Sequence, residues 1–282
     1  MSVARQASPR RWREGVKPPR QHDLFDAGSG TPLIVIPGVQ GRWEWMKPAL
    51  RELRKHCRTV SYTLCGDIGS GVCFNPELGF DNYVHQLDEV FRTTGIERAA
   101  LCGVSYGGFI ALRYAALRPE RVSSLILVSS PAPGWVPTVR QQAYVSHPWR
   151  SAPAFVVNAP MRLWPEIRAA FDTWEERLRF TARHALRVIA APIIPPVMAA
   201  RVTLQQSIDF APDCARVKAP TLIVTGEDHL DKIVPAAITR GYRALIPGAQ
   251  SISMERSGHI GLLTRPARFA EIVTGFIDAN NH

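Results

Sequence analysis

The sequence of 282 residues predicts an α/β protein with a mostly parallel, doubly wound sheet and a helical insertion between two of its strands. Two observations lead to this expectation. Short apolar runs alternate with segments of helical spacing, and this alternation is interrupted once, over residues 131–212. Alternating strands and helices are typical of a parallel sheet that helices cover on both faces.

The expected strands are short, continuous apolar runs, as suits strands that are buried on both faces. They lie at 24–30, 33–36, 59–64, 99–102, 124–128, 221–225 and, with a weaker pattern, 251–254. The first of them closes in a glycine-rich turn. Segments with helical spacing lie between the strands, at about 44–55, 81–93, 106–118, 236–245 and 265–278.

The chain is expected to have three parts. Residues 1–22 form a basic leader whose Pro, Ser and Arg content predicts a disordered, solvated segment. Residues 23–130 and 213–282 form the α/β core. Residues 131–212 form the helical insertion, which lacks strand-like runs and contains four of the seven tryptophans and nine arginines against five acidic residues.

Composition excludes several classes of protein. No stretch approaches the roughly 20 apolar residues of a membrane-spanning helix, and no apolar segment follows Arg10 and Arg11, as an export signal would require. The five cysteines are odd in number and include no C-x-x-C pair, which argues against a disulfide framework and a structural zinc site. No groove-reading motif follows the basic leader. We therefore expect a cytoplasmic protein with no membrane or nucleic-acid partner.

Ser105 is the candidate nucleophile. It lies in the G-x-S-x-G pattern of residues 103–107, between an expected strand and an expected helix. A sharp turn at this place strains the backbone of the serine and lifts its hydroxyl clear of the sheet, while the glycines let strand and helix approach. A serine that caps a helix would give a similar local pattern, so the interpretation depends on the strand–turn–helix context.

His259 is the candidate base that would take the proton of the serine. It lies between glycine neighbours, after the last expected strand, where the carboxyl ends of parallel strands gather functional residues. A carboxylate should orient its ring. Asp228 and Asp231 both lie in the loop after the 221–225 strand, and either is also suited to cap a turn or a helix. We favour Asp231.

Two backbone N–H groups are expected to form an oxyanion hole, in which the loss of one donor costs about 3 kcal/mol of transition-state stabilisation. Tyr106 follows the nucleophile at the start of a helix and supplies one donor. Val39, in the glycine-rich loop after the 33–36 strand, supplies the other. The same glycines would also suit a tight turn, which is compatible with this role.

The chain order Ser105, Asp231, His259, the segment GVSYGG, the glycine-rich loop and the insertion after 124–128 together resemble the α/β-hydrolase superfamily with a helical cap. The resemblance covers residues 24–279. Two features depart from the family pattern. Pro37 stands where members commonly have histidine. The loop after the 221–225 strand, which carries the candidate aspartates, is about two residues longer than the common G-x-x-D-x-x-V-P spacing.

The GVSYGG segment, called the elbow here, carries a serine. This disfavours the dehalogenase and epoxide hydrolase chemistry that the family performs with a carboxylate nucleophile. The resemblance implies a serine hydrolase that cleaves a carboxylic ester or lactone of a small to medium apolar substrate through an acyl-enzyme, without cofactor or metal. The same triad would also serve hydrolysis of a carbon–carbon bond of the meta-cleavage type, or perhydrolysis. A non-catalytic protein that binds small molecules is a third alternative, because fold does not fix function.

Other features of the sequence leave the substrate open. No nucleotide-binding glycine motif occurs, and the trio of His229, Asp228 and Asp231 matches no zinc motif. Trp43, Trp45 and the tryptophans of the insertion fit an apolar cleft equally well as packing of a cap against the core. The sequence does not indicate an oligomeric state.

Overall fold

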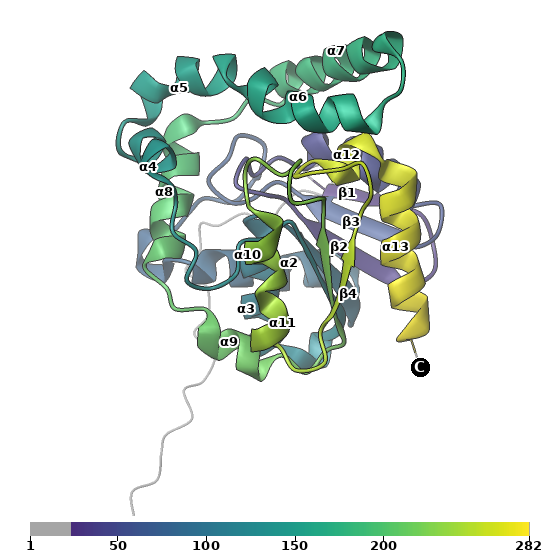
Figure 1. The fold of residues 1–282 in the computed structure, drawn as a ribbon. Coiled ribbons are helices and arrows are strands. Elements are labelled where there is room, and N and C mark those ends of the chain that lie inside the picture. The colour runs from purple at the N-terminus through teal and green to yellow at the C-terminus, as the bar shows by residue number, and fades with distance from the viewer. Residues whose placement is uncertain (1–23, 282) are drawn as a thin grey trace, which may run out of the picture.

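The computed structural model describes residues 24–281, so the predicted leader lies outside the described residues. Its centre is a seven-stranded sheet with the strand order β1-β3-β2-β4-β5-β6-β7 (Figure 1). Strand β1 pairs antiparallel with β3, and all other neighbouring strands among the described residues are parallel. The strands are β1 (Leu24–Ala27), β2 (Pro32–Ile36), β3 (Arg58–Tyr62), β4 (Ala99–Val104), β5 (Val122–Val128), β6 (Thr221–Thr225) and β7 (Gln250–Ser253). The predicted fold class is confirmed.

The central strands are apolar throughout because each of their faces contributes to a separate core. In β2, Ile34 belongs to one cluster of buried side chains, whereas its neighbour Val35 belongs to the other. The same alternation places Leu101 and Cys102 of β4 in different clusters. Successive side chains of a strand point to opposite faces, so a strand covered on both sides shows a continuous apolar run.

Helices cover the two faces as the sequence predicts. The first cluster is closed by α2 (Asp81–Thr94), α3 (Gly107–Leu117), α9 (Ala211–Arg216), α10 (Ala236–Arg240) and α11 (Tyr242–Leu245). The second is closed by α1 (Lys47–Leu53), α12 (Gly261–Thr264) and α13 (Pro266–Ala279). The expected helix at 236–245 is divided at Gly241, and the segment expected from 44 begins with a 3₁₀ turn, η2 (Trp43–Met46). The short helix α12 was not expected.

Six helices lie between β5 and β6 in the chain, and the first five of them, which precede α9, are called the inserted helices here. They are α4 (Val139–Ser146), α5 (Pro148–Val157), α6 (Ala159–Ala170), α7 (Trp174–Ala190) and α8 (Pro195–Gln206). Figure 1 places α5, α6 and α7 above the end of the sheet where α12 begins. Ile167 of α6 and Phe180 of α7 join the second core cluster, so the inserted helices pack against the sheet domain itself.

The inserted helices also carry much of the exposed apolar surface. Of the fourteen large apolar side chains exposed among residues 24–281, eleven lie within 131–212. Trp149 and Trp174 are 67% and 62% exposed, so these two tryptophans neither pack on the core nor line a closed cleft. In the described part of the chain, no single helix is long and apolar enough to cross a membrane; α7 and α8, bent by 91°, meet that test only as a pair.

The central position of β4 gives a test of the fold. Leu101 is fully buried between β2 and β5, so Leu101→Ala should lower the free energy of unfolding by about 3 kcal/mol, through lost burial and a residual cavity. The same change at Leu117, which is 37% exposed on α3, should cost less than about 1 kcal/mol. Urea denaturation measures both values, and equal losses would contradict the assigned core.

Candidate active site

Ser105 occupies the turn between β4 and α3 in a strained backbone conformation. Its φ of 52° lies in the left-handed region, which residues other than glycine rarely adopt. Its N–H donates to the carbonyl of Val128 at 2.8 Å, and its carbonyl accepts from the N–H of Gly108 at 2.9 Å. Such strain costs on the order of 1–3 kcal/mol and persists only where the surrounding structure enforces it.

The glycines around Ser105 are required by close backbone packing. A Cβ atom on Gly103 would lie 2.4 Å from the carbonyl oxygen of Gly107. One on Gly107 would lie 2.4 Å from the carbonyl oxygen of Ile36, at the end of β2. The elbow therefore packs against the start of the loop that follows β2, which is the approach that the G-x-S-x-G pattern predicts.

The two predicted oxyanion donors lie in these adjoining segments. Tyr106 is the residue that precedes α3, and the first N–H groups of a helix have no partner within it. Val39 lies in the neighbouring loop, which is closed by a 2.9 Å hydrogen bond from Gly41 N–H to the carbonyl of Gly38. A Cβ on Gly38 would stand 3.4 Å from the Cβ of Ser105. The Val39 loop is thus adjacent to Ser105.

His259 and Asp231 are in contact. Nδ1 of His259 lies 3.1 Å from Oδ2 of Asp231, and the two residues are only 7% and 4% exposed. The other carboxylate oxygen, Oδ1, accepts the backbone N–H groups of Ile233 and Val234, each at 2.9 Å. The loop after β6 therefore fixes the carboxylate. With Nδ1–H donating to Asp231, Nε2 is the basic nitrogen of the ring.

The structure separates the two candidate aspartates. The side chain of Asp228 is 63% exposed and pairs with Arg240 at 2.9 Å, and this hydrogen bond lowers the pKa of Asp228. Neighbouring His229 is also exposed and lies 3.5 Å from Glu227. Of the two carboxylates that the sequence left open, Asp231 is the one that contacts His259.

The loops that carry Asp231 and His259 are joined by their backbones. Glu227 N–H donates to the carbonyl of Ser257 at 2.8 Å, and the Glu227 carboxylate accepts the N–H of Arg256 at 2.6 Å. A Cβ on Gly258 would lie 2.6 Å from the carbonyl oxygen of Leu230. Only glycine permits this approach, so the residue before His259 is part of what brings the ring to the carboxylate.

The ring of His259 is more basic than an ordinary imidazole. Burial by itself would lower the pKa of His259, but the charge of Asp231, its hydrogen bond and the charge of Glu166 together raise that pKa above 6.5. A neighbouring negative charge favours the protonated ring. The site is therefore suited to hold an imidazolium once a proton has been accepted.

Glu166 was not identified from the sequence. It lies on α6, is 1% exposed, and its carboxylate accepts the N–H of Ile260 at 3.0 Å and the hydroxyl of Thr264 at 3.2 Å. Gly258 packs closely against it, since a Cβ on that glycine would lie 2.8 Å from Oε2 of Glu166. The sequence offers one signal, an acidic residue inside the apolar segment LeuTrpProGluIle. It does not indicate that the partner of this residue is Ile260, 94 residues later.

Arg201 of α8 was also missed. It is 1% exposed, and its guanidinium donates to the carbonyls of Val39 at 3.0 Å and Cys65 at 3.1 Å, and to the hydroxyl of Tyr83 at 3.3 Å. It also forms a buried ion pair with Asp67. An inserted helix therefore holds the loop that contains Val39. In the sequence, Arg201 is simply the first charged residue after a long apolar stretch.

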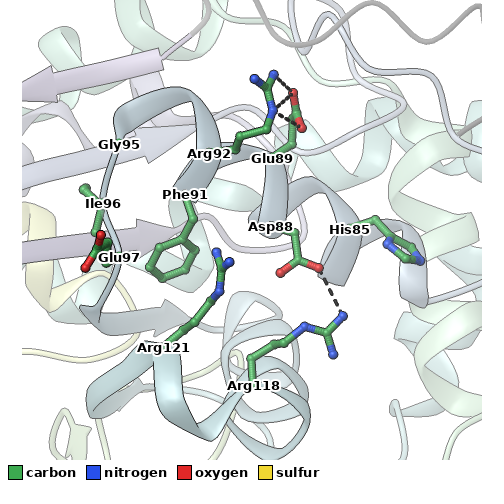
Figure 2. A pocket seen from close by; sticks show the side chains of 10 residues that line it. All are labelled: His85, Asp88, Glu89, Phe91, Arg92, Gly95, Ile96, Glu97, Arg118 and Arg121. Carbon is green, nitrogen blue, oxygen red and sulfur yellow. Dashed lines mark hydrogen bonds and ion pairs between the residues drawn. The ribbon is translucent and has the colours of Figure 1, made fainter. Parts of the chain in front are cut away.

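A separate groove lies on another part of the molecule (Figure 2). It has a volume of about 660 Å³ and lies between α2, the loop at 95–97 and η4 (Pro119–Arg121). Its charged groups largely pair with one another, since Arg118 contacts Asp88 at 3.2 Å. The 95–97 loop and η4 precede β4 and β5, so this groove lies at the amino ends of the strands, away from Ser105. None of the predicted site residues lines it.

Within residues 24–281, no group of three or more His, Cys, Asp or Glu side chains is arranged to hold a metal ion. All five cysteines are unpaired thiols, four of them buried.

Removing one partner from the buried ion pair of Arg201 and Asp67 should be strongly destabilising. Replacing Arg201 by Met leaves a buried carboxylate without its partner and should cost about 3–5 kcal/mol. The double variant Asp67→Asn, Arg201→Met should lose clearly less than the sum of the two single changes. Arg118→Met, which breaks a partly exposed pair, should cost less than about 1 kcal/mol. Denaturant unfolding of the four variants checks this; additive losses would contradict the coupling.

Comparison with known proteins agrees with this architecture. A family profile described as the alpha/beta hydrolase fold matches residues 31–266. The chain is 30% identical over 256 residues to the "Putative carbamate hydrolase RutD" of Klebsiella pneumoniae, which covers 86% of this chain and 90% of the relative. It is 29% identical over 293 residues to the 2-hydroxymuconate semialdehyde hydrolase of Pseudomonas sp. CF600, over 97% of this chain and 96% of the relative.

A solved structure gives the same result for the fold. The enol-lactonase from Burkholderia xenovorans LB400 aligns with a TM-score of 0.72 at 21% sequence identity, over 90% of this chain and 95% of that one. The family resemblance that the sequence indicated, from the GVSYGG segment and the chain order of Ser105, Asp231 and His259, is thereby confirmed. The chain belongs to the alpha/beta hydrolase fold family.

Proposed function

We propose that the protein is a serine hydrolase that cleaves a carboxylic ester or lactone of a small to medium apolar substrate through an acyl-enzyme. The observation that carries this proposal is the 3.1 Å contact between His259 and Asp231, in a fold whose β4–α3 turn holds Ser105 in a strained conformation. A strained serine alone would suit a helix cap, and a buried His–Asp pair alone would suit a structural contact. Their combination, in a chain whose relatives are named hydrolases, favours catalysis.

In the proposed mechanism, Nε2 of His259 accepts the proton of Ser105 as Oγ forms a bond to the carbonyl carbon. Asp231 stabilises the resulting imidazolium. The N–H groups of Val39 and Tyr106 stabilise the negative charge on the carbonyl oxygen. The bond to the leaving oxygen breaks, and the imidazolium gives its proton to that oxygen. Water then attacks the acyl-enzyme, loses a proton to His259, and the acid is released as Ser105 regains its own proton.

The proposal assigns residues 131–212 to a cap over this site and needs neither cofactor nor metal. It is supported by the two buried side chains, Glu166 and Arg201, that the inserted helices direct to the loops of His259 and Val39. The expected partner is a small molecule, with no nucleic acid and no membrane. The five unpaired thiols suit the expected cytoplasmic location.

A second candidate function is hydrolysis of a carbon–carbon bond. The similarity to a 2-hydroxymuconate semialdehyde hydrolase extends over 97% of this chain, and this is the observation that favours it. The carbamate in the name of the Klebsiella relative offers another carbonyl that the same serine could attack. Ester, lactone, carbamate and dienoate-type substrates therefore form the panel on which the proposal should be tested, with hydrogen peroxide added to detect perhydrolysis.

Ser105 gives the direct test of the serine mechanism. A fluorophosphonate should label the wild-type protein at Ser105, as located by mass spectrometry. Ser105→Ala should remain folded, lose the label and lose turnover of the best substrate by at least about 10³-fold. Ser207→Ala, at the exposed serine that follows α8, should keep both. A wild-type protein that is neither labelled nor active on the panel would favour a non-catalytic binding protein.

The two aspartates allow a matched comparison. Asp231→Asn should reduce kcat by about 10⁴-fold, because it removes the charge and the acceptor that hold the ring in its working tautomer. Asp228→Asn, at an exposed carboxylate paired with Arg240, should change kcat by less than about twofold. Steady-state kinetics on purified variants measures both. Similar losses in the two variants would contradict the assignment of Asp231.

The pH dependence follows from the direction of the His259 shift. His259 accepts a proton only in its neutral form, and its pKa is raised above 6.5, so kcat/KM should fall as the pH decreases through that raised pKa. Residual activity of Asp231→Asn should extend to lower pH, because the pKa of the ring falls when the negative charge is removed. A profile of kcat/KM against pH checks this, and an acidic limb at or below pH 6 in the wild type would contradict it.

A further inference from the structure

We propose that Glu166 is a positioning residue for His259, through which helix α6 holds the histidine loop in its working geometry. This inference rests on the proposed function. It concerns a side chain that comes from the inserted helices and that lies outside the triad and the oxyanion hole. Its hydrogen bonds go to Ile260 and Thr264, which follow the base, and it packs closely against Gly258, which precedes the base.

The first support is geometric. The carboxylate of Glu166 accepts the N–H group of Ile260, the residue immediately after His259, at 3.0 Å. Its second oxygen accepts the hydroxyl of Thr264 on α12. A carboxylate that binds both the residue after the base and the helix that follows it constrains the backbone from which the base projects. Hydrogen bonds to a charged acceptor are roughly twice as strong as those between neutral groups.

The second support is the close packing around this carboxylate. A Cβ on Gly258 would lie 2.8 Å from Oε2 of Glu166 and 2.6 Å from the carbonyl oxygen of Leu230. The histidine loop is therefore held between the inserted helix on one side and the loop of Asp231 on the other. A displacement of Glu166 would move the backbone of residue 258, and with it the separation of His259 from Asp231.

The third support is electrostatic. The charged groups that act on the His259 ring are Asp231, from the loop after β6, and Glu166, from α6. Both favour the protonated ring. Burial raises the pKa of Glu166 itself, while the N–H groups of Ile260 and Gly258 oppose that rise. The backbone donors thus help a carboxylate to remain ionised in a place where it would otherwise be costly.

Helix α6 has other attachments, so a change at Glu166 can be studied in a folded protein. Ile167 is buried in the second core cluster, and the side chain of Arg256 donates to the carbonyl of Ala169 at 2.6 Å and pairs with Asp172. These contacts anchor α6 independently of its carboxylate. Glu166→Gln removes the charge but keeps an acceptor for the N–H of Ile260. Glu166→Ala removes both.

The two variants should separate the two effects. Glu166→Gln should shift the acidic limb of the kcat/KM profile to lower pH, with kcat on the plateau reduced by less than about fivefold. Glu166→Ala should show the same shift and also lose kcat by about 10-fold or more, with KM changed by less than about twofold, because a small misplacement of a catalytic group is costly. Glu175→Gln and Glu175→Ala, at an exposed carboxylate on α7, are the matched controls and should leave kcat, KM and the profile unchanged.

NMR titration of the His259 ring supplies a readout that does not require activity. The pKa of the ring should be lower in both Glu166 variants than in the wild type and in the Glu175 controls. An unchanged ring pKa together with kcat within twofold of the controls would overturn the inference. Loss of stability with an unmoved pH profile would also overturn it, since that is the result of a purely structural role.

The test distinguishes this inference from the proposed function. If the wild type is neither labelled by the fluorophosphonate nor active, the proposed function fails. The ring titration then still decides whether Glu166 acts on His259. If the wild type is labelled and active but the Glu166 variants behave as the controls do, only the inference about Glu166 fails.

Discussion

The buried contact between His259 and Asp231 is the constraint on which the candidate site depends. Two ionisable groups that are less than one-tenth exposed lose most of their hydration, and each must recover it from fixed partners. Asp231 does so with two backbone N–H groups on one oxygen and the imidazole on the other. The hydrogen bonds of this one carboxylate therefore constrain the geometry of the loop after β6. The longer spacing of this loop, compared with the common family pattern, leaves Asp228 in solvent and Asp231 at the ring.

The inserted helices also bury ionised side chains, which must find partners within the protein. They do so at two places, with charges of opposite sign. Glu166 brings a negative charge to the histidine loop, and Arg201 brings a positive charge to the loop of Val39. A buried ion is stable only when its remaining donors or acceptors are satisfied, and removal of a single partner is costly. Each of these ions finds its partners on the core. The position of the inserted helices is thereby linked to the backbone of both loops more specifically than apolar packing alone would allow.

The parts of the structure that could be predicted are those in which a local pattern decides the outcome. Continuous apolar runs identified the strands because both faces of the sheet are covered, and the glycines at 103 and 107 indicated the elbow because no side chain fits there. The choice between Asp228 and Asp231 depended on which of them the folded loop brings to His259. The sequence favoured Asp231 but could not decide between them. Glu166 and Arg201 were missed because their partners lie far away in the sequence, 94 residues for Ile260 and 162 for Val39, and several of those partners are backbone groups, which leave no signal in the sequence. The exposure of Trp149 and Trp174 could not be predicted either, because tryptophan side chains are usually largely buried.

The arginine surplus of the insertion raises the question of an anionic substrate, and the structure argues against Arg201 as its receptor. Four hydrogen bonds occupy the guanidinium of Arg201, out of the five N–H donors that the group possesses, and all of them go to the protein. Arg150, Arg168, Arg179 and Arg183 are exposed on the inserted helices, where solvent weakens their fields. A substrate charge would therefore meet no free buried cation among these side chains.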